Sequence, residues 1–272
     1  MSGIATLPAL DSAHPIDAET VAAFARDGHV IVRDLATRAE VDAYRPAIVD
    51  TAAQLCRESR PLDERDSYGK AFLQSCNLWC ANEDVARFVH APRFARVAAA
   101  LLGVDRVRLY HDQALFKEVG GGATPWHQDM FYWPLDTEQT VTMWMPLHDV
   151  DERAGLMAFA DGSHRLGDLR GREISDRSEA EFAELVAHRS LPVSATPPLA
   201  AGDASFHAGW TLHRAGANTT GSVREAFTII YFADGARLRE PRSGYERFDA
   251  AVWLPGVEVG ALAASPINPV LG

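Results

Sequence analysis

Three side chains in this sequence are suited to binding one divalent metal ion. His127 and Asp129 are separated by a single residue in the segment TPWHQDMFYW. In an extended chain, residues two apart point to the same side, so the imidazole and the carboxylate can converge on one point. His213, in WTLHRAGAN, is the candidate third ligand. Two histidines and one carboxylate leave three octahedral positions open, which suits non-haem iron(II) with a bidentate co-substrate and dioxygen.

An isolated H-x-D pair is a weak indication, because it is frequent by chance and most single histidines are core or surface residues. Arg224 strengthens the metal hypothesis. It follows His213 by eleven residues, and the turn-rich segment RAGANTTGSV between them permits a hairpin. An arginine buried in a barrel needs an anion, such as a carboxylate bound by both ends of the guanidinium. The alternative is a surface arginine in a turn.

Residues from about 15 to 103 are expected to be mainly helical, with HVIVRDL as one short strand. Thr37 and Glu40 form a T-x-x-E capping box in front of one of the helices. Pro46 lies inside that helical pattern and is expected to kink or divide it.

From Val104 the periodicity changes to that of strands. The expected strands are RVRLYHDQALFKEV, TVTMWMPLHDV, GLMAFADGSH, ASFHAGWTLH and REAFTIIYFA, with SEAEFAELVAHRS as a helix among them. Helices first and antiparallel strands afterwards predict an α+β, mainly β protein with a jelly-roll core at about 104–235. We expect residues 1–272 to form a single domain.

The bulk composition excludes some classes of function. The chain has 272 residues, 37 of them acidic and 26 basic, and no basic run that would bind nucleic acid. Three cysteines, an odd and sparse set, predict free thiols in a reducing cytoplasm. The segment MSGIATLPALDSAHP lacks the features of a signal peptide, and no apolar run is long enough for a membrane span. We therefore expect a soluble, cytoplasmic protein without nucleic-acid or membrane partners; its oligomeric state stays open.

The sequence resembles the phytanoyl-CoA dioxygenase (PhyH) family of iron(II)/2-oxoglutarate oxygenases over most of the chain, from about Gly28 to Phe232. The resemblance is carried by PWHQD at 125–129, TMWMPLHDVDERAG at 142–155, DGSHRLG at 161–167 and AGDASFHAGWTLHRAGANTTGSVR at 201–224. An H-x-D, then H-x4-N, then an arginine eleven residues after that histidine is a specific combination.

The resemblance implies a double-stranded β-helix (a cupin-like jelly roll) with helices packed outside it. It implies three iron ligands at the catalytic centre: His127, Asp129 and His213. Arg224 would bind the distal carboxylate of 2-oxoglutarate, and Trp144 and Gln113 would line the pocket for this co-substrate. For Trp144, a purely structural role in the core is an equally good interpretation.

Two positions refine what the resemblance implies. Related proteins often carry a serine that contacts the co-substrate two residues after the distal histidine, and here that residue is Ala215. Halogenating relatives replace the metal-binding carboxylate with a small residue so that chloride can bind. Since Asp129 is present, halogenation is disfavoured. The expected cofactor is iron(II), with 2-oxoglutarate and dioxygen as co-substrates; whether ascorbate acts as a reductant stays open.

Other residues are weaker candidates for the pocket. His111 is expected to line it, His207 to support a ligand or the fold, and His164 to be structural. Further possible substrate contacts are Phe131, Tyr132 and Trp133 after the H-x-D motif, and Lys70, Gln74, Asn77 and Trp79 in the segment 65–84.

The predicted activity is hydroxylation of an unactivated C–H bond in a small organic molecule. Desaturation, epimerisation and cyclisation use the same ligand set and stay open. One alternative is a non-catalytic, cupin-like protein that binds a metal and a 2-oxo acid. Another is a zinc hydrolase with the same ligands and an activated water.

Overall fold

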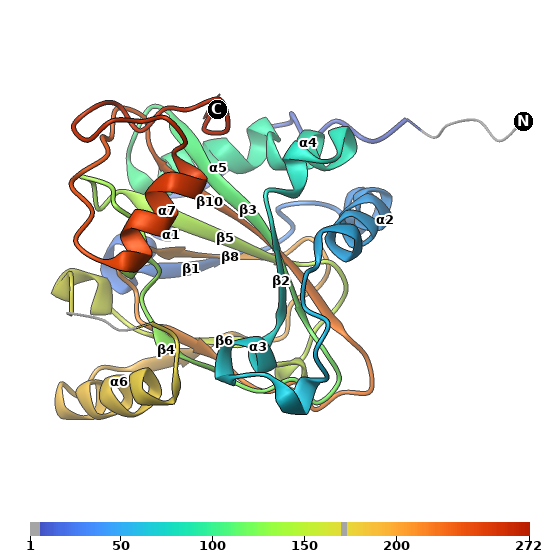
Figure 1. The fold of residues 1–272 in the computed structure, drawn as a ribbon. Coiled ribbons are helices and arrows are strands. Elements are labelled where there is room, and N and C mark those ends of the chain that lie inside the picture. Colours follow the sequence, from blue (N-terminus) through green and yellow to red (C-terminus); the bar gives the residue numbers. More distant parts are fainter. Residues whose placement is uncertain (1–5, 170–172) are drawn as a thin grey trace, which may run out of the picture.

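Two antiparallel sheets face each other in the computed structural model, which describes residues 6–169 and 173–272 (Figure 1). The larger sheet consists, in spatial order, of β1 (His29–Val32), β8 (Ala204–Ala208), β5 (Thr140–Pro146), β10 (Arg224–Ala233), β3 (Val107–Lys117) and β11 (Val270–Leu271), with β2 (Leu73–Cys76) also paired to β3. The smaller sheet consists of β4 (Thr124–His127), β9 (His213–Ala215), β6 (Met157–Ala160) and β7 (Val193–Ala195). The predicted α+β jelly roll is confirmed.

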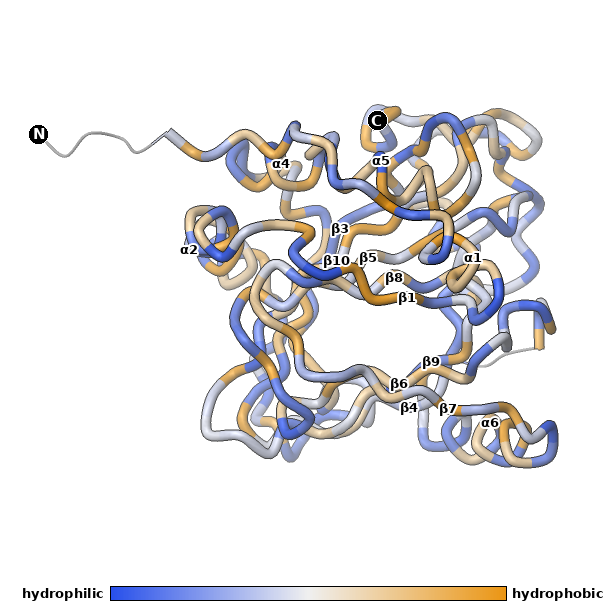
Figure 2. Tube along the Cα trace, turned by 180° about the vertical axis from the view of Figure 1, so that it is seen from behind, coloured by the Kyte–Doolittle hydropathy of each residue, from blue (hydrophilic) through white to orange (hydrophobic). Residues whose placement is uncertain are grey.

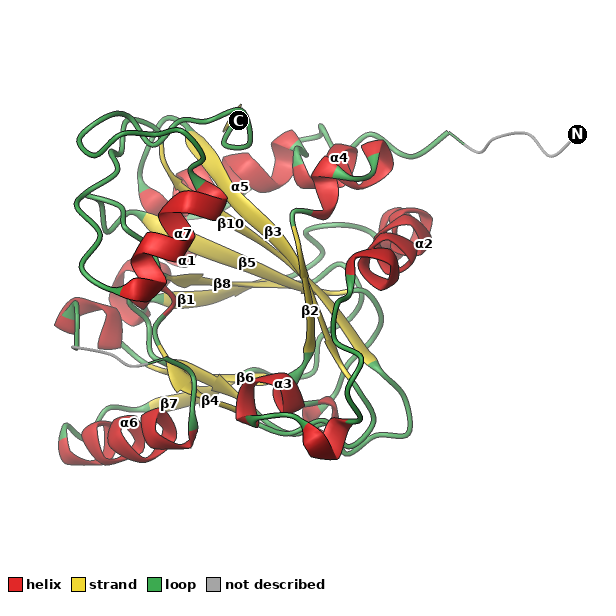
Figure 3. Ribbon diagram, in the orientation of Figure 1, coloured by secondary structure: helices red, strands yellow, loops and turns green. Residues whose placement is uncertain are grey.

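Helices lie outside the two sheets (Figure 3). They are α1 (Ala18–Asp27), α2 (Arg38–Leu55), α3 (Ser67–Ala71), α4 (Glu83–Val89), α5 (Pro92–Leu102), α6 (Asp176–His188) and α7 (Gly244–Trp253). Short 3-10 turns are η1 (Leu62–Glu64), η2 (Leu78–Cys80), η3 (Asp129–Phe131), η4 (Glu152–Ala154) and η5 (Ser163–Leu166). Apolar residues of α2, α4 and α5 form one core with the outer face of the larger sheet, and α6 packs on β4 of the smaller sheet.

Local capping signals place the ends of the helices. The Thr37 side chain accepts a hydrogen bond from the backbone N–H of Glu40, whose carboxylate accepts one in return, so the capping box begins α2 as predicted. Pro46 lies inside α2, which continues through it, so of the two expected outcomes, a kink or a division, the helix is not divided. The buried side chains of Val41 and Ile48 hold the helix on the core on both sides of the proline, which offsets the missing hydrogen bond.

The amino-terminal part contributes more to the larger sheet than its helical pattern predicts. β1 pairs with β8 at one edge, with His29 opposite His207. β2, which the sequence analysis missed, pairs with β3 over four residues, with Cys76 opposite Gln113. A strand this short has no periodicity of its own and is defined by its partner.

Seen from behind, β1 and β8 lie above β6 and β9, and hydrophobic residues are prominent along β1 (Figure 2). Across the described ranges, no helix combines the length and the apolar character that a membrane crossing requires. The three cysteines are free. Residues 1–5, part of the segment expected to lack a signal peptide, lie outside the described residues.

Candidate metal centre

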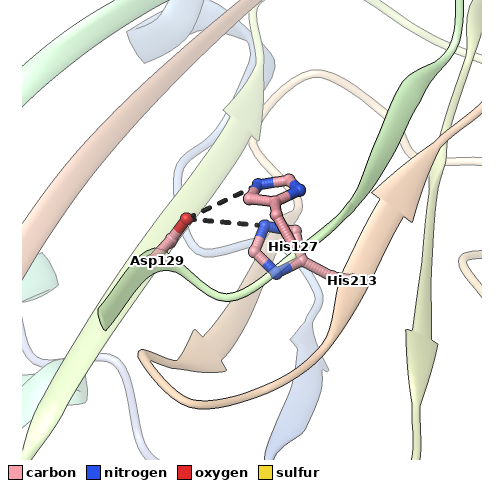
Figure 4. A group of neighbouring side chains, drawn as sticks. All are labelled: His127, Asp129 and His213. Atoms are coloured by element: carbon pink, nitrogen blue, oxygen red, sulfur yellow. Dashed lines mark ion pairs between the residues drawn. The ribbon is translucent and has the colours of Figure 1, made fainter. Parts of the chain in front are cut away.

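His127, Asp129 and His213 meet between the two sheets (Figure 4). One ligand atom from each lies within 4.8 Å of the other two. Oδ1 of Asp129 lies 3.6 Å from Nε2 of His127 and 3.7 Å from Nε2 of His213. Donors that share one ion at about 2.1 Å in adjacent octahedral positions lie about 3 Å apart. Movements of less than about one ångström would therefore bring this donor set to bonding distance.

Strand pairing brings the two histidines together. His127 ends β4 and stands opposite His213, the first residue of β9. The chain stays extended through Gln128, and Asp129 then begins the 3-10 turn η3. The extended geometry expected for the H-x-D segment thus ends at its carboxylate, which turns toward the imidazoles.

Each imidazole presents its Nε2 lone pair to the cluster. Nδ1 of His127 lies 2.7 Å from the carbonyl oxygen of Pro125, and Nδ1 of His213 lies 3.0 Å from that of Thr211. A carbonyl can only accept, so Nδ1 carries the proton and Nε2 stays free, as in metal-binding histidines. Burial lowers the pKa of His127 to about 3 and that of His213 to about 4, so both rings are neutral at pH 7.

The second oxygen of Asp129 is held by two neighbours. The Thr142 hydroxyl donates a hydrogen bond of 2.9 Å to Oδ2, and Nε2 of His207 lies 3.1 Å from the same atom. Burial opposes ionisation of Asp129, but His213 and the hydrogen bond from His207 hold its pKa below the ordinary value. The carboxylate is therefore ionised and oriented, and His207 supports a ligand as expected.

Arg224 is buried at the start of β10, and within the part of the chain that the structure describes it has no acidic partner. Its Nη1 donates to the carbonyl of Gly155 at 3.1 Å and its Nη2 to that of Leu115 at 3.2 Å, while its buried Nε has no partner. None of the ion pairs within the described ranges includes Arg224. Its guanidinium carbon lies 5.2 Å from the ring centroid of Trp144. The surface alternative for this arginine is thereby excluded, and burial lowers its pKa to about 10, which still leaves it charged.

Lys117, which the sequence analysis did not single out as a site residue, is a second buried cation beside Arg224. The two residues are opposite each other in the β3–β10 pair. The Lys117 ammonium donates to the carbonyl of Gly122 and lies 3.4 Å from the hydroxyl of Thr124. Burial and the charge of Arg224 lower its pKa to about 7. Among the residues that the structure describes, no carboxylate pairs with either cation, so this end of the site suits an anion.

Thr124 also bears on the missing serine at position 215. It lines the cavity and stands directly opposite Ala215 in the β4–β9 pair. Its hydroxyl is therefore in a position to replace the contact that Ala215 lacks. The irregular register of this strand pair hides such a replacement from the sequence.

A cavity of about 490 Å³ connects the metal-binding triad with Arg224. Its wall includes several residues that the sequence predicted: Gln74, His111, Gln113, Tyr132, Trp133 and Trp144. Gln113 accepts a hydrogen bond of 2.6 Å from Gln74, which accepts one of 2.8 Å from the Tyr68 hydroxyl. These hydrogen bonds hold one polar side of the cavity in place.

Four of the possible substrate contacts do not line the cavity: Lys70, Asn77, Trp79 and Phe131. Alternation along β2 turns Gln74 and Cys76 toward the cavity, whereas Asn77 and Trp79 lie beyond the strand. The ring of Phe131 packs on Tyr132 instead, with centroids 4.9 Å apart. His164 also lies outside the wall, with Nε2 3.3 Å from a backbone carbonyl, as expected of a structural residue.

The sequence analysis missed α7, which adds four residues to the wall: Tyr245, Phe248, Asp249 and Trp253. A signal was present, because Ser243 and Glu246 form an S-x-x-E pattern in front of an amphipathic segment. The Ser243 side chain indeed caps α7, accepting from the backbone N–H of Glu246.

Comparison with known proteins identifies relatives that are iron- and 2-oxoglutarate-dependent oxygenases. The profile of the family described as Phytanoyl-CoA dioxygenase (PhyH) matches residues 24–226. A probable alpha-ketoglutarate-dependent hypophosphite dioxygenase of Stutzerimonas stutzeri is 26% identical over 135 residues, 47% of this chain and 46% of that protein. This chain therefore aligns with less than half of that relative. An ectoine dioxygenase of Sphingopyxis alaskensis is 25% identical over 250 residues, 84% of this chain and 79% of that protein.

Solved structures share the double-stranded β-helix. The non-heme alpha ketoglutarate dependent carbocyclase SnoK from nogalamycin biosynthesis superimposes with a TM-score of 0.77 at 26% identity, covering 94% of this chain and 97% of that one. The epimerase SnoN, in complex with Fe3+, alpha ketoglutarate and nogalamycin RO, superimposes with a TM-score of 0.76 at 27% identity, covering 93% and 98%. Iron and 2-oxoglutarate are thus bound in a relative of the same fold.

Proposed function

Because the chain belongs to the phytanoyl-CoA dioxygenase family of iron(II)/2-oxoglutarate-dependent oxygenases, we propose that it hydroxylates a C–H bond of a small organic molecule. One observation carries the proposal. A preoriented set of two neutral histidines and one carboxylate shares a cavity with Arg224, a buried cation that has no acidic partner in the described part of the chain. The buried Lys117 stands opposite Arg224 in the neighbouring strand.

One end of the cavity would bind the metal ion and the other the distal carboxylate of 2-oxoglutarate. His127, Asp129 and His213 would hold iron(II), which when bound supplies dioxygen activation coupled to decarboxylation of 2-oxoglutarate. At the other end, Arg224 would bind the distal carboxylate. Lys117, opposite Arg224 and 3.4 Å from the Thr124 hydroxyl, would add positive charge near it, and Thr124 would donate a hydrogen bond.

The surrounding residues orient the reactants and exclude water. Thr142 and His207 keep one oxygen of Asp129 occupied, so that the other faces the metal position. Trp144 packs against the Arg224 guanidinium and keeps it directed at the cavity. The presence of Asp129 argues against halogenation, since chloride would need its place.

Anaerobic titration with iron(II) and 2-oxoglutarate tests the proposal. The loaded protein should show a weak visible charge-transfer band, and Asp129→Ala should lose it. Arg224→Met should weaken 2-oxoglutarate binding about ten- to hundred-fold, because it removes charge-assisted hydrogen bonds of about 1.5–3 kcal/mol. Arg177→Met, on the exposed face of α6, is the matched control and should bind normally. An unchanged 2-oxoglutarate affinity in Arg224→Met contradicts the assignment.

Aerobic turnover separates the remaining functions. Hydroxylation should release succinate and add one oxygen atom to the product, whereas cyclisation, epimerisation and desaturation leave the product without that atom. If the charge-transfer band forms but no succinate is released with any substrate tried, a non-catalytic 2-oxo-acid-binding protein is favoured. Zinc-dependent hydrolysis that survives Arg224→Met would favour a hydrolase.

A further inference from the structure

One face of α7 forms the side of the cavity away from the 2-oxoglutarate end. Tyr245, Phe248, Asp249 and Trp253 are spaced by three, one and four residues, which places them along one face of a helix. Figure 1 shows α7 crossing in front of the larger sheet. Tyr245 is 44% and Phe248 63% exposed although both belong to the wall, so this part of α7 borders the cavity mouth.

Asp249 is the buried acid of this face. It is only 7% exposed and lies in the cavity wall. Its Oδ2 accepts a hydrogen bond of 3.2 Å from the Tyr110 hydroxyl, and the Trp253 side chain is a second donor to the carboxylate. Both donors are neutral, and none of the ion pairs within the described ranges includes Asp249. Burial raises its pKa to about 7. A carboxylate this buried is stabilised by a cation or by further donors, which a ligand in the cavity can provide.

Two cationic side chains, Arg239 beside α7 and Arg214 in the cavity wall, pair with acids other than Asp249. Arg239 forms a bidentate pair with Glu246, with distances of 2.6 and 2.7 Å. Arg214, in the cavity wall, pairs with Glu179 at 3.1 Å. Burial lowers the pKa of His111 to about 4, so this neighbouring ring is neutral and brings no charge. Among the described residues, therefore, no cation pairs with Asp249, and a ligand in the cavity can supply that partner.

Aromatic side chains make up much of the rest of the cavity wall. The rings in the wall are Tyr68, Phe72, Tyr132, Trp133, Trp144, Tyr245, Phe248 and Trp253. Trp253 stacks on His111 with centroids 4.5 Å apart, which fixes its ring plane beside Asp249. Such walls favour a ring-bearing, apolar body, and their π faces also stabilise a cation held near them.

We propose that α7 is the specificity element and that the substrate is a ring-bearing amine whose ammonium group binds Asp249. The inference deepens the proposed function, and it rests on that function for the assignment of this cavity as the substrate site. An ammonium forms a charge-assisted hydrogen bond with the carboxylate, an alcohol forms a weaker neutral one, and an anion is repelled.

Three molecules with the same ring system and different end groups test the charge preference: 2-(2-naphthyl)ethylamine, 2-(2-naphthyl)ethanol and 2-naphthylacetate. Calorimetric titration uses the full chain at pH 8, first metal-free and then loaded anaerobically with iron(II) and 2-oxoglutarate. The amine should bind at least ten-fold more tightly than the alcohol, and the carboxylate most weakly. Asp249→Asn should reduce the preference for the amine to within two-fold, whereas Asp105→Asn, at an exposed site, should leave it unchanged.

The ranking in the unmutated chain is itself a test, so the inference stays falsifiable if Asp249→Asn does not fold. Equal affinities, a preference for the carboxylate, binding of none of the three, or a preference that persists in Asp249→Asn would each overturn it. The proposed function fails separately, through the absence of the iron(II) and 2-oxoglutarate band. An amine preference in the metal-free chain without that band would support the binding site and refute the oxygenase.

Discussion

Replacing Lys117 with methionine removes a buried ammonium while keeping a side chain of similar length. The pKa of Lys117 is lowered from 10.5 to about 7, first by burial and then by the charge of Arg224. The difference of about 3.5 pKa units between the ordinary and the folded-state value corresponds to about 4–5 kcal/mol of destabilisation when the side chain is protonated, at about 1.4 kcal/mol per pKa unit. The loss of its hydrogen bonds to Gly122 and Thr124 costs about 1–2 kcal/mol. Lys117→Met should therefore be about 3 kcal/mol more stable than the unmutated, ligand-free protein at pH 6.

The pH dependence of the stability shows whether the buried ammonium of Lys117 causes the destabilisation. Below pH about 7 both the folded and the unfolded chain carry the proton, so the full destabilisation is present. Between about 7 and 10.5 the folded state releases the proton that the unfolded state keeps, so stability rises with pH by at most about 1.4 kcal/mol per unit. Above 10.5 both states are neutral and the destabilisation is gone. Lys117→Met lacks this rise, so its advantage should shrink steadily toward alkaline pH.

Urea denaturation of the metal-free protein at several values between pH 6 and 10 measures the effect. Lys70→Met is the matched control, because Lys70 and Lys117 are the two lysines of the chain. Isotopic labelling of lysine should then give two sets of resonances, and an NMR titration reads the pKa of Lys117 directly. Parallel stability profiles for Lys117→Met and the unmutated chain, or a Lys117 resonance that titrates near 10.5, would refute the reasoning.

Four further substitutions test other parts of the structure. His207→Phe removes a hydrogen bond to the metal-binding carboxylate and should weaken iron(II) binding about ten- to hundred-fold in a direct titration; unchanged affinity would contradict its supporting role. Gly202→Ala should cost more than about 3 kcal/mol in urea denaturation, because φ is +98° and the new Cβ would lie 1.9 Å from a backbone carbonyl oxygen. Gly103→Ala, also at positive φ but in open space, should cost only about 1 kcal/mol, and equal losses would argue against the clash. Burial opposes ionisation of Glu246, but Arg239 holds its pKa below the ordinary value of 4.5. Glu246→Gln should therefore destabilise the protein by about 3 kcal/mol at pH 7 and less as the pH falls below 4.5; a constant difference would exclude the ion pair as the cause.

Local chemistry in the sequence predicted the start of α2 and the run of antiparallel strands, and together with the family resemblance it predicted the residues of the metal centre. Capping depends on side chains within a few residues of each other, so the box of Thr37 and Glu40 is visible without coordinates. The spacing of the H-x-D motif, His213 and Arg224 is likewise a property of the chain, and the structure brings these residues to one cavity.

The pairing register of distant strands decided which further residues meet at the site. Thr124 stands opposite Ala215, and Lys117 opposite Arg224, only because strands distant in the chain pair in one particular register. Likewise, Asp249 becomes a buried acid through the packing of α7 over the cavity. Periodicity tells which face of an element is apolar, but not which other element covers it, because that choice depends on the free energy of the whole packed structure.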